Sequence, residues 1–251
     1  MVRYGTARLP DGLRVYAIGD VHGEITQLKA LHAAIEADLD AHPVADWRVV
    51  HLGDLIDRGP DSAGVLALLA RLDPGRFLCV CGNHDAYLRN FFADPNDPKF
   101  TNWQTYGGQE TLRSFGLDRA LIREGERREI HDALVAAMPA DTLDYLNGLP
   151  DQLRFGDFGF AHAGVRPGIS WEAQERADLR WIRHAFLDHA GLHDVFVVHG
   201  HTPASRIDLR PNRVNVDTGA AKGGPLSCAV IEGAEIMALD GPRRVTLTPP
   251  G

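Results

Sequence analysis

The chain has 251 residues and carries 26 lysines and arginines against 34 aspartates and glutamates, a formal net charge of −8. Its length is sufficient for a well-packed core, and its balanced composition excludes a disordered, collagen-like or coiled-coil protein. An acidic chain also fits poorly with a binder of nucleic-acid polymers, since such binding depends on Lys and Arg. No apolar run approaches the ~18 residues that a membrane span needs, and residues 1–11 hold no apolar stretch of signal-peptide type. We therefore expect a cytoplasmic protein that binds neither a membrane nor a nucleic-acid polymer.

The first third of the chain alternates short apolar runs with helical patterns. The apolar runs predict strands at 13–18, 47–52 and 77–81, each followed by glycine and a polar residue. Apolar residues at helical spacing predict one helix over 25–39 and another after Gly59-Pro60-Asp61. Strands that alternate with helices form βαβ units, which indicates an α/β fold with parallel strands.

The middle of the chain, residues 89–150, is mostly helical in pattern, polar, and interrupted by prolines and glycines. It is too short and too polar for a core of its own, so we interpret it as a helical insertion in a single domain spanning 1–251. Beyond it we predict a hairpin through Gly156-Asp157 and a helix over 172–189. Strands are predicted at 153–155, 158–162, 195–199, 213–217, 226–231 and 235–239.

Polar clusters flanked by glycine follow the predicted strands: Asp20-Val21-His22, Asp54, Asn83-His84-Asp85, His162 and Gly200-His201. In open α/β sheets, ligands bind at the carboxyl ends of strands, so these residues can meet although they span the chain. Asp20 and His22 offer an oxygen and a nitrogen to one cation, and the two oxygens of Asp54 can bridge two cations. Asn83 adds an amide oxygen, and His162 and His201 add nitrogens. A mixed oxygen and nitrogen set without thiolates is typical of manganese, iron or zinc.

Such a set predicts hydrolysis without a Ser or Cys nucleophile. Two metal ions about 3.5–4 Å apart polarise a phosphoryl group and lower the pKa of a bridging water, so that hydroxide attacks. Arg58 is placed to bind phosphate oxygens through its forked donors. His84 is placed to protonate the leaving oxygen, with Asp57 orienting its ring and raising its pKa.

Five motifs of the chain together resemble a known signature. They are Gly19 to Gly23, Gly53 to Gly59, Gly82 to Asp85, Ala161-His162-Ala163-Gly164 and Gly200-His201-Thr202-Pro203. The signature is that of the phosphoprotein phosphatase branch of the calcineurin-like metallophosphoesterases, closest to its small bacterial and phage members. The resemblance covers roughly residues 14–219 and implies a four-layer αββα sandwich with a dinuclear site at the sheet edges. It implies that Asp20, His22 and Asp54 bind one metal, and that Asp54, Asn83, His162 and His201 bind the other.

The same resemblance implies that Asp57 and His84 form an acid pair and that Arg58 binds phosphate. Arg183 is similar to a second phosphate-binding arginine of the family, although an arginine in a predicted helix usually faces solvent. We thus take Arg58, Arg183 and Asn83 as candidates for substrate binding. Asp85 stands where the protein phosphatases usually carry Glu, and Pro203 stands where broader members carry a further His ligand.

Other interpretations remain beside these. Asp20 and Asp54 can each be helix N-caps, and Cys79, Cys81 and His199 fit buried strand positions. The insertion residues Trp103, Tyr106, Gly107 and Gly108 belong either to a lid over the site or to the packing of the insertion.

The leading functional hypothesis is a Ser/Thr protein phosphatase-like phosphomonoesterase with two metal ions, manganese first and iron or zinc as alternatives. Its substrates would be a phosphorylated protein or peptide, or a small phosphoester. One alternative is a symmetrical bis(5'-nucleosyl)-tetraphosphatase with the same site. The other is a non-catalytic metal-binding module that senses phosphate or nucleotides, against which a general acid argues because binding alone does not need one.

Overall fold

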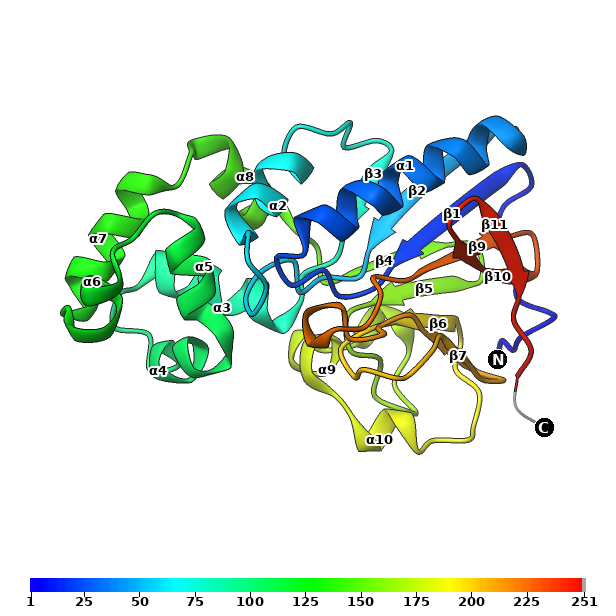
Figure 1. Ribbon diagram of the computed structural model, residues 1–251. Helices are drawn as coiled ribbons and strands as arrows, with labels where there is room; N and C mark the ends of the chain where they lie inside the picture. Colours follow the sequence, from blue (N-terminus) through cyan, green and yellow to red (C-terminus); the bar gives the residue numbers. More distant parts are fainter. Residues whose placement is uncertain (250–251) are drawn as a thin grey trace.

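Two β-sheets lie face to face, each with helices on its outer side, in the computed structural model, which describes residues 1–249 (Figure 1). The first sheet has the order β11-β10-β9-β1-β2-β3, and the second has the order β4-β5-β6-β8-β7. The strands of the first sheet are β1 (Leu13–Ile18), β2 (Asp46–His51), β3 (Phe77–Cys79), β9 (Cys228–Glu232), β10 (Glu235–Asp240) and β11 (Arg243–Thr246). Those of the second are β4 (Gln152–Phe155), β5 (Phe158–Ala161), β6 (Phe196–His199), β7 (Asp208–Leu209) and β8 (Arg213–Asn215). The expected four-layer α/β sandwich is confirmed.

The side chains of β1 alternate between its two faces and pack against both neighbouring layers. Val15 and Ala17 belong to the apolar cluster between the two sheets, whereas Tyr16 and Ile18 belong to the cluster under the helices of the first sheet. Successive side chains of a strand point to opposite faces, so a strand buried on both faces reads as a continuous apolar run. Cys79 and Cys81 both lie in the cluster under the helices, as expected for core residues.

The outer helices differ between the two sheets. α1 (Ile25–Ala41) and α2 (Ser62–Leu69) pack on the first sheet, and Asp61 caps α2 by accepting the Gly64 N–H at 2.8 Å. The short elements η2 (Trp171–Ala173), α9 (Arg176–Trp181) and α10 (His184–Leu187) cover the second sheet. The prediction of one helix over 172–189 is therefore wrong, because the chain leaves helical geometry at Ile182 and Arg183. A last short turn, η3, spans Ala220–Lys222.

The segment that we interpret from the sequence as an insertion carries helices, and these gather at one end of the molecule, away from β10 and β11 (Figure 1). Its elements are α3 (Asn83–Ala93), α4 (Phe100–Trp103), η1 (Gln104–Gly108), α5 (Gln109–Ser114), α6 (Arg119–Glu124), α7 (Arg127–Ala137) and α8 (Ala140–Gly148). Its buried side chains Phe91, Trp103 and Leu134 belong to the same apolar cluster as Tyr16 of β1. The insertion is thus continuous with the core beneath α1 and α2.

Strand direction brings the polar clusters together. β1, β2 and β3 are parallel to one another, as are β5, β6 and β8. Asp20, Asp54 and Asn83 follow the three strands of the first set, and His162 and His201 follow β5 and β6. In residues 1–249, no helix combines the length and the apolar character required to cross a membrane.

Candidate metal and phosphoester site

The backbone is strained where the polar clusters lie. Across residues 1–249, the non-glycine residues with positive φ are His22 (45°), Asp54 (49°), Asp57 (74°), Arg58 (66°) and His201 (68°). All of them belong to the candidate site predicted from the sequence. A non-glycine residue in this region costs roughly 1–3 kcal/mol and persists only when surrounding contacts hold it there. Such strain concentrates at functional sites, so its location here is independent support for the candidate residues.

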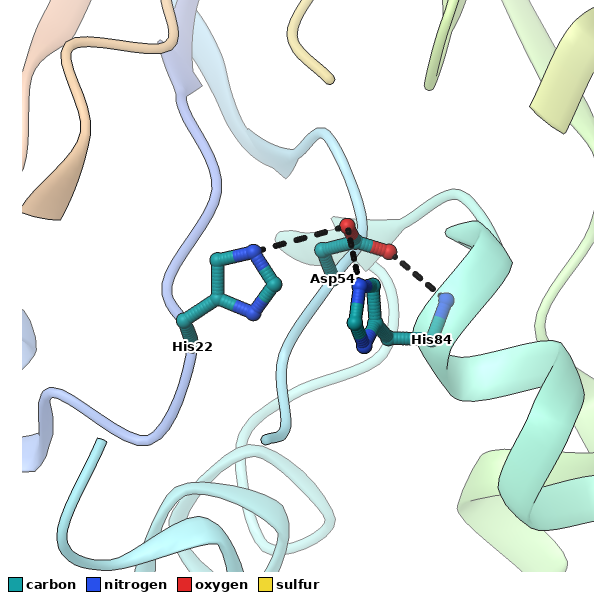
Figure 2. Close-up of side chains that lie close together, drawn as sticks. All are labelled: His22, Asp54 and His84. Carbon is teal, nitrogen blue, oxygen red and sulfur yellow. Dashed lines mark hydrogen bonds and ion pairs between the residues drawn. The ribbon is translucent and has the colours of Figure 1, made fainter. Parts of the chain in front are cut away.

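Asp54 lies at the centre of the site and faces histidines on two sides. Its Oδ2 atom is 3.5 Å from His22 Nε2 and 4.0 Å from His84 Nε2, as Figure 2 shows. Its Oδ1 atom is 3.4 Å from His162 Nε2. Two buried groups result, one of His22, Asp54 and His84 and one of Asp54, His162 and His201, in which the potential ligand atoms lie within 4.8 Å of one another. This shared carboxylate suits a pair of cations.

Two of the imidazoles are oriented by backbone carbonyls. His22 Nδ1 donates to Ile56 O at 2.7 Å, and His162 Nδ1 donates to Leu52 O at 2.8 Å. This leaves each Nε2 lone pair directed toward the centre of the site, the arrangement that usually orients a metal-binding histidine. The donor set and its orientation therefore fit divalent metal ions.

Asp20 and Asn83 lie beside these groups. Both oxygens of Asp20 accept the backbone N–H of His201 at 3.1 Å, and Asn83 Oδ1 is 2.9 Å from His162 Nε2. Asp20 belongs to neither compact group, and His84 stands in the first group where the sequence predicts Asp20. Asp217, after β8, has a buried Oδ2 atom without a hydrogen-bond partner and interacts electrostatically with Asp20.

Burial and charge set the ionisation of the site. Burial lowers the pKa of His22 and of His201 to about 3, so both imidazoles are neutral at pH 7. Burial also opposes protonation of His162, yet the Asp54 and Asp20 carboxylates outweigh it and raise the His162 pKa to about 10. Burial disfavours the charged form of Asp54, but His162 and His84 hold the Asp54 pKa well below its ordinary value. A metal ion competes with the His162 proton, since only a neutral imidazole binds metal.

His84 and Asp57 form a buried pair next to this centre. His84 Nδ1 and Asp57 Oδ2 are 2.5 Å apart, and both side chains are almost fully excluded from solvent. Burial opposes protonation of His84, but Asp54 and then Asp57 outweigh it and raise the His84 pKa. The pair thus has the geometry and electrostatics of an oriented proton donor.

Two arginines line the pocket that opens on the site. Arg58 donates to His22 Nε2 at 2.6 Å and to His84 Nε2 at 2.9 Å, and Arg183 Nε donates to His201 Nε2 at 3.0 Å. The pocket has a volume of about 340 Å³, and its wall also includes Tyr87, Asn102, Tyr106 and Trp181. The break between α9 and α10 is what brings Arg183 to this position.

Several residues contact the site in roles that the sequence did not reveal. The Asp85 carboxylate accepts three backbone N–H groups, from Gly82 (2.8 Å), Asp54 (2.9 Å) and Leu55 (3.0 Å). It therefore ties the loop after β3 to the loop after β2. Trp103 and Thr111 of the insertion contact Asp57, and Trp103 is fully buried while Tyr106 is exposed. Only the position of Asp85 at the start of a helix was a usable signal, because an acidic residue there often binds free N–H groups.

His199 lies outside the two histidine groups. It is fully buried at the end of β6, where its ring stands edge-on to Phe186 at a centroid distance of 5.0 Å. This agrees with its interpretation as a buried strand residue.

Comparison with known proteins gives one consistent family. The family described as calcineurin-like phosphoesterase matches residues 13–223. Serine/threonine-protein phosphatase 1 of Salmonella typhimurium is 30% identical over 226 residues, which cover 87% of this chain and 92% of that protein. The asymmetrical bis(5'-nucleosyl)-tetraphosphatase PrpE of Anoxybacillus flavithermus is 28% identical, covering 84% of this chain and 87% of that protein. A solved structure assigned provisionally as a diadenosine tetraphosphatase has a TM-score of 0.63 and 26% identity, covering 94% of this chain and 98% of that chain.

Proposed function

This chain belongs to the calcineurin-like phosphoesterase family, and on that premise we propose that it is a phosphomonoesterase of the Ser/Thr protein phosphatase type. The observation that carries the proposal is the buried centre around Asp54, which has a histidine group on each side and the His84–Asp57 pair beside it. The similarity to the Salmonella enzyme over most of both chains supports the same substrate class.

In this proposal two divalent metal ions, manganese first among them, would be held at the centre around Asp54. Asp54, Asp20 and His22 would hold one ion, and the other would be held by the set Asp54, Asn83, His162 and His201. When bound, the ions supply positive charge that polarises a phosphoryl group and lowers the pKa of water. His84 differs from His22 and His162 in that its Nδ1 meets a carboxylate, Asp57, rather than a backbone carbonyl, and this pairing favours the protonated ring. We therefore assign His84 to proton transfer and not to the ligand set.

The side chains around the centre position the substrate and move a proton. Arg58 and Arg183 release the imidazole nitrogens and bind phosphate oxygens, which holds the phosphoryl group in line. Once Arg58 has left His84 Nε2, that nitrogen carries the proton that the raised His84 pKa favours and gives it to the leaving-group oxygen. Asp57 remains on Nδ1 and stabilises the protonated ring until the transfer. Pure phosphate binding has no use for such a pair, so these residues favour catalysis over a sensing module.

A second candidate is a bis(5'-nucleosyl)-tetraphosphatase, and the wall of the pocket favours it. Trp181 and Tyr106, which are 39% and 55% exposed, are the exposed large aromatic side chains of residues 1–249, and both line this pocket. Exposed aromatic rings stack on nucleobases, with a gain of about 1–3 kcal/mol per base. Relatives with tetraphosphatase names support this candidate as well.

One experiment separates the two candidates. Protein stripped with EDTA is reloaded with Mn²⁺, and kcat/KM is measured on a phosphoserine or phosphothreonine peptide and on diadenosine tetraphosphate in the same preparation. We expect faster turnover of the phosphopeptide, and turnover of both substrates that depends on metal. Faster turnover of the tetraphosphate would replace the first candidate by the second, and Trp181→Ala should then reduce tetraphosphate turnover more than phosphopeptide turnover.

The control is Asp54→Asn, purified in parallel. It should abolish turnover of both substrates without unfolding the protein, which excludes a contaminating phosphatase. Failure of the native chain to hydrolyse any phosphoester with Mn²⁺, Zn²⁺ or Fe²⁺ would contradict the proposed function.

A further inference from the structure

Two side chains of the insertion hold the carboxylate of Asp57. Trp103 Nε1 donates to Asp57 Oδ2 at 2.9 Å and lies 3.1 Å from Oδ1, and Thr111 Oγ1 donates to Oδ1 at 2.5 Å. Together with His84 Nδ1 on Oδ2, these donors account for both oxygens of the carboxylate. Asp57, Trp103 and Thr111 are all fully buried, so water cannot replace a lost donor.

The same segment also holds the backbone at Asp57 and Arg58. The Asp57 N–H is shared between Thr111 Oγ1 at 3.0 Å and Ser62 Oγ at 2.9 Å, and the Arg58 N–H donates to Gly107 O at 3.3 Å. Asp57 and Arg58 are consecutive non-glycine residues in the left-handed region. Residues in that region need external contacts to stay there, and the insertion supplies them on both residues.

The backbone of the insertion packs closely against Arg58 and Trp103 at Gly107 and Gly108. Gly107 has a φ of 118°, and a Cβ atom there would lie 2.7 Å from Arg58 N. A Cβ atom at Gly108 would lie 2.6 Å from the Trp103 ring. The two glycines thus allow the insertion to approach Arg58 and to bring the indole N–H of Trp103 onto Asp57.

We propose that Trp103 and Thr111 are positioning residues that aim the Asp57 carboxylate at His84 Nδ1, so that His84 Nε2 faces the pocket. Neither residue belongs to the described pocket wall or to the two histidine groups, and both act through Asp57. The inference rests on the proposed role of His84 as proton donor to the leaving group. In this proposal the insertion contributes to catalysis by positioning Asp57, in addition to packing against the core.

The activity test compares Thr111→Val, which removes the hydroxyl at nearly constant volume, with Thr111→Ser, which keeps it. Thr142→Val is the matched control, because Thr142 is a buried threonine of the same insertion that does not contact the site. The substrates are phenyl phosphate, whose leaving group needs a proton, and p-nitrophenyl phosphate, whose leaving group departs without one. We expect Thr111→Val to lower kcat on phenyl phosphate about tenfold with KM unchanged, and to affect p-nitrophenyl phosphate much less.

The conservative and double variants sharpen this test. Thr111→Ser should restore most of the activity, and Thr142→Val should behave like the native protein. Thr111→Val should have no further effect on an Asp57→Asn background, because residues that act through one group are not additive. Trp103→Phe, which removes the indole N–H, should show the same leaving-group dependence as Thr111→Val. Equal losses on the two esters, or an additive double variant, would overturn the positioning role.

A second readout does not depend on activity. The proton in the short His84–Asp57 hydrogen bond should give a ¹H NMR resonance downfield of the amide region in the full chain, with and without Zn²⁺, and Asp57→Asn should remove it. Thr111→Val should shift or broaden this resonance, whereas Thr142→Val should leave it in place. An unchanged resonance in Thr111→Val would overturn the inference. If the native chain cleaves neither ester, the proposed function fails, and the NMR comparison still decides the positioning role.

Discussion

Asp85 is expected to stabilise the two loops that carry the site, so that even the small change to Asn lowers the stability of the protein. It is fully buried at the start of α3, and its two oxygens accept the N–H groups of Gly82, Asp54 and Leu55. Two of these donors share Oδ2, and Leu55 alone binds Oδ1. In Asp85→Asn the amide oxygen can replace Oδ2, but the amide nitrogen then faces the Leu55 N–H, which is left without an acceptor.

The magnitude follows from that count of donors. A hydrogen bond to a charged group contributes about 1.5–3 kcal/mol, and an unsatisfied buried donor costs about 1–3 kcal/mol. The two values describe largely the same loss, so they are not added together. Burial, and then repulsion from Asp54, raise the pKa of Asp85 to about 6, so removing its charge returns part of this loss. We therefore expect Asp85→Asn to lower the free energy of unfolding by about 2 kcal/mol, or Tm by about 4–8 °C for a chain of this size.

The assay is urea unfolding of the metal-free protein at pH 8, with Asp61→Asn as the matched control. Asp61 accepts a single N–H as the N-cap of α2, a position where Asn caps as well as Asp, so that variant should lose less than about 0.5 kcal/mol. Asp85→Asn should also weaken Mn²⁺ binding, since the lost Leu55 N–H contact loosens the loop in which the adjacent Asp54 is held at positive φ. Equal destabilisation by the two variants would refute the reasoning from donor number.

Further predictions concern the proposed metal centre, the proposed phosphate-binding role of Arg183 and the stability of the protein at low pH. Asp54→Asn should abolish both phosphoester hydrolysis and the rise in Tm on adding Mn²⁺, and retention of either would remove Asp54 as the bridging ligand. Arg183→Gln should raise KM about tenfold and change kcat little, because it removes one charged contact to phosphate. Burial of Asp38 opposes its ionisation, but hydrogen bonds from Arg244 and Tyr16 outweigh burial and lower the Asp38 pKa. Since the folded-state pKa lies below the unfolded one, Asp38 stabilises the protein above about pH 4, and the stability advantage over Asp38→Asn should shrink as the pH falls further.

The strands and the polar clusters could be predicted because both leave local signals. A strand buried on both faces is apolar at most of its positions, as β1 is apart from Arg14, and the polar residues that follow its carboxyl end interrupt the apolar run. Glycine beside each cluster marks the tight turn. Parallel strands bring Asp20 and Asp54 to one edge of the first sheet, whereas His162 follows a strand of the second sheet and meets them because the two sheets are stacked. The short edge strands β7 and β11 lacked such a pattern because edge positions bury fewer side chains.

The break between α9 and α10 could not be predicted from local sequence. Residues 172–189 contain neither proline nor glycine, and their apolar spacing is compatible with a continuous helix. The non-helical backbone at Ile182 and Arg183 instead accompanies a tertiary contact, in which Arg183 reaches His201 across the site. Tertiary contacts of this kind override helical propensity, which is a weak preference for any single residue.

The contacts between the insertion and Asp57 could not be predicted from local sequence either. Trp103 and Thr111 lie 46 and 54 residues from Asp57 in sequence, so no spacing rule connects them. Within this one segment Trp103 points inward to Asp57, whereas Tyr106, three positions later, is exposed in the pocket wall. A backbone shift in the segment therefore moves the aromatic wall and the carboxylate behind His84 together. Substitutions at Tyr106 that keep the backbone should alter substrate choice alone, whereas changes at Gly107, which touches Arg58, should alter substrate choice and proton transfer together.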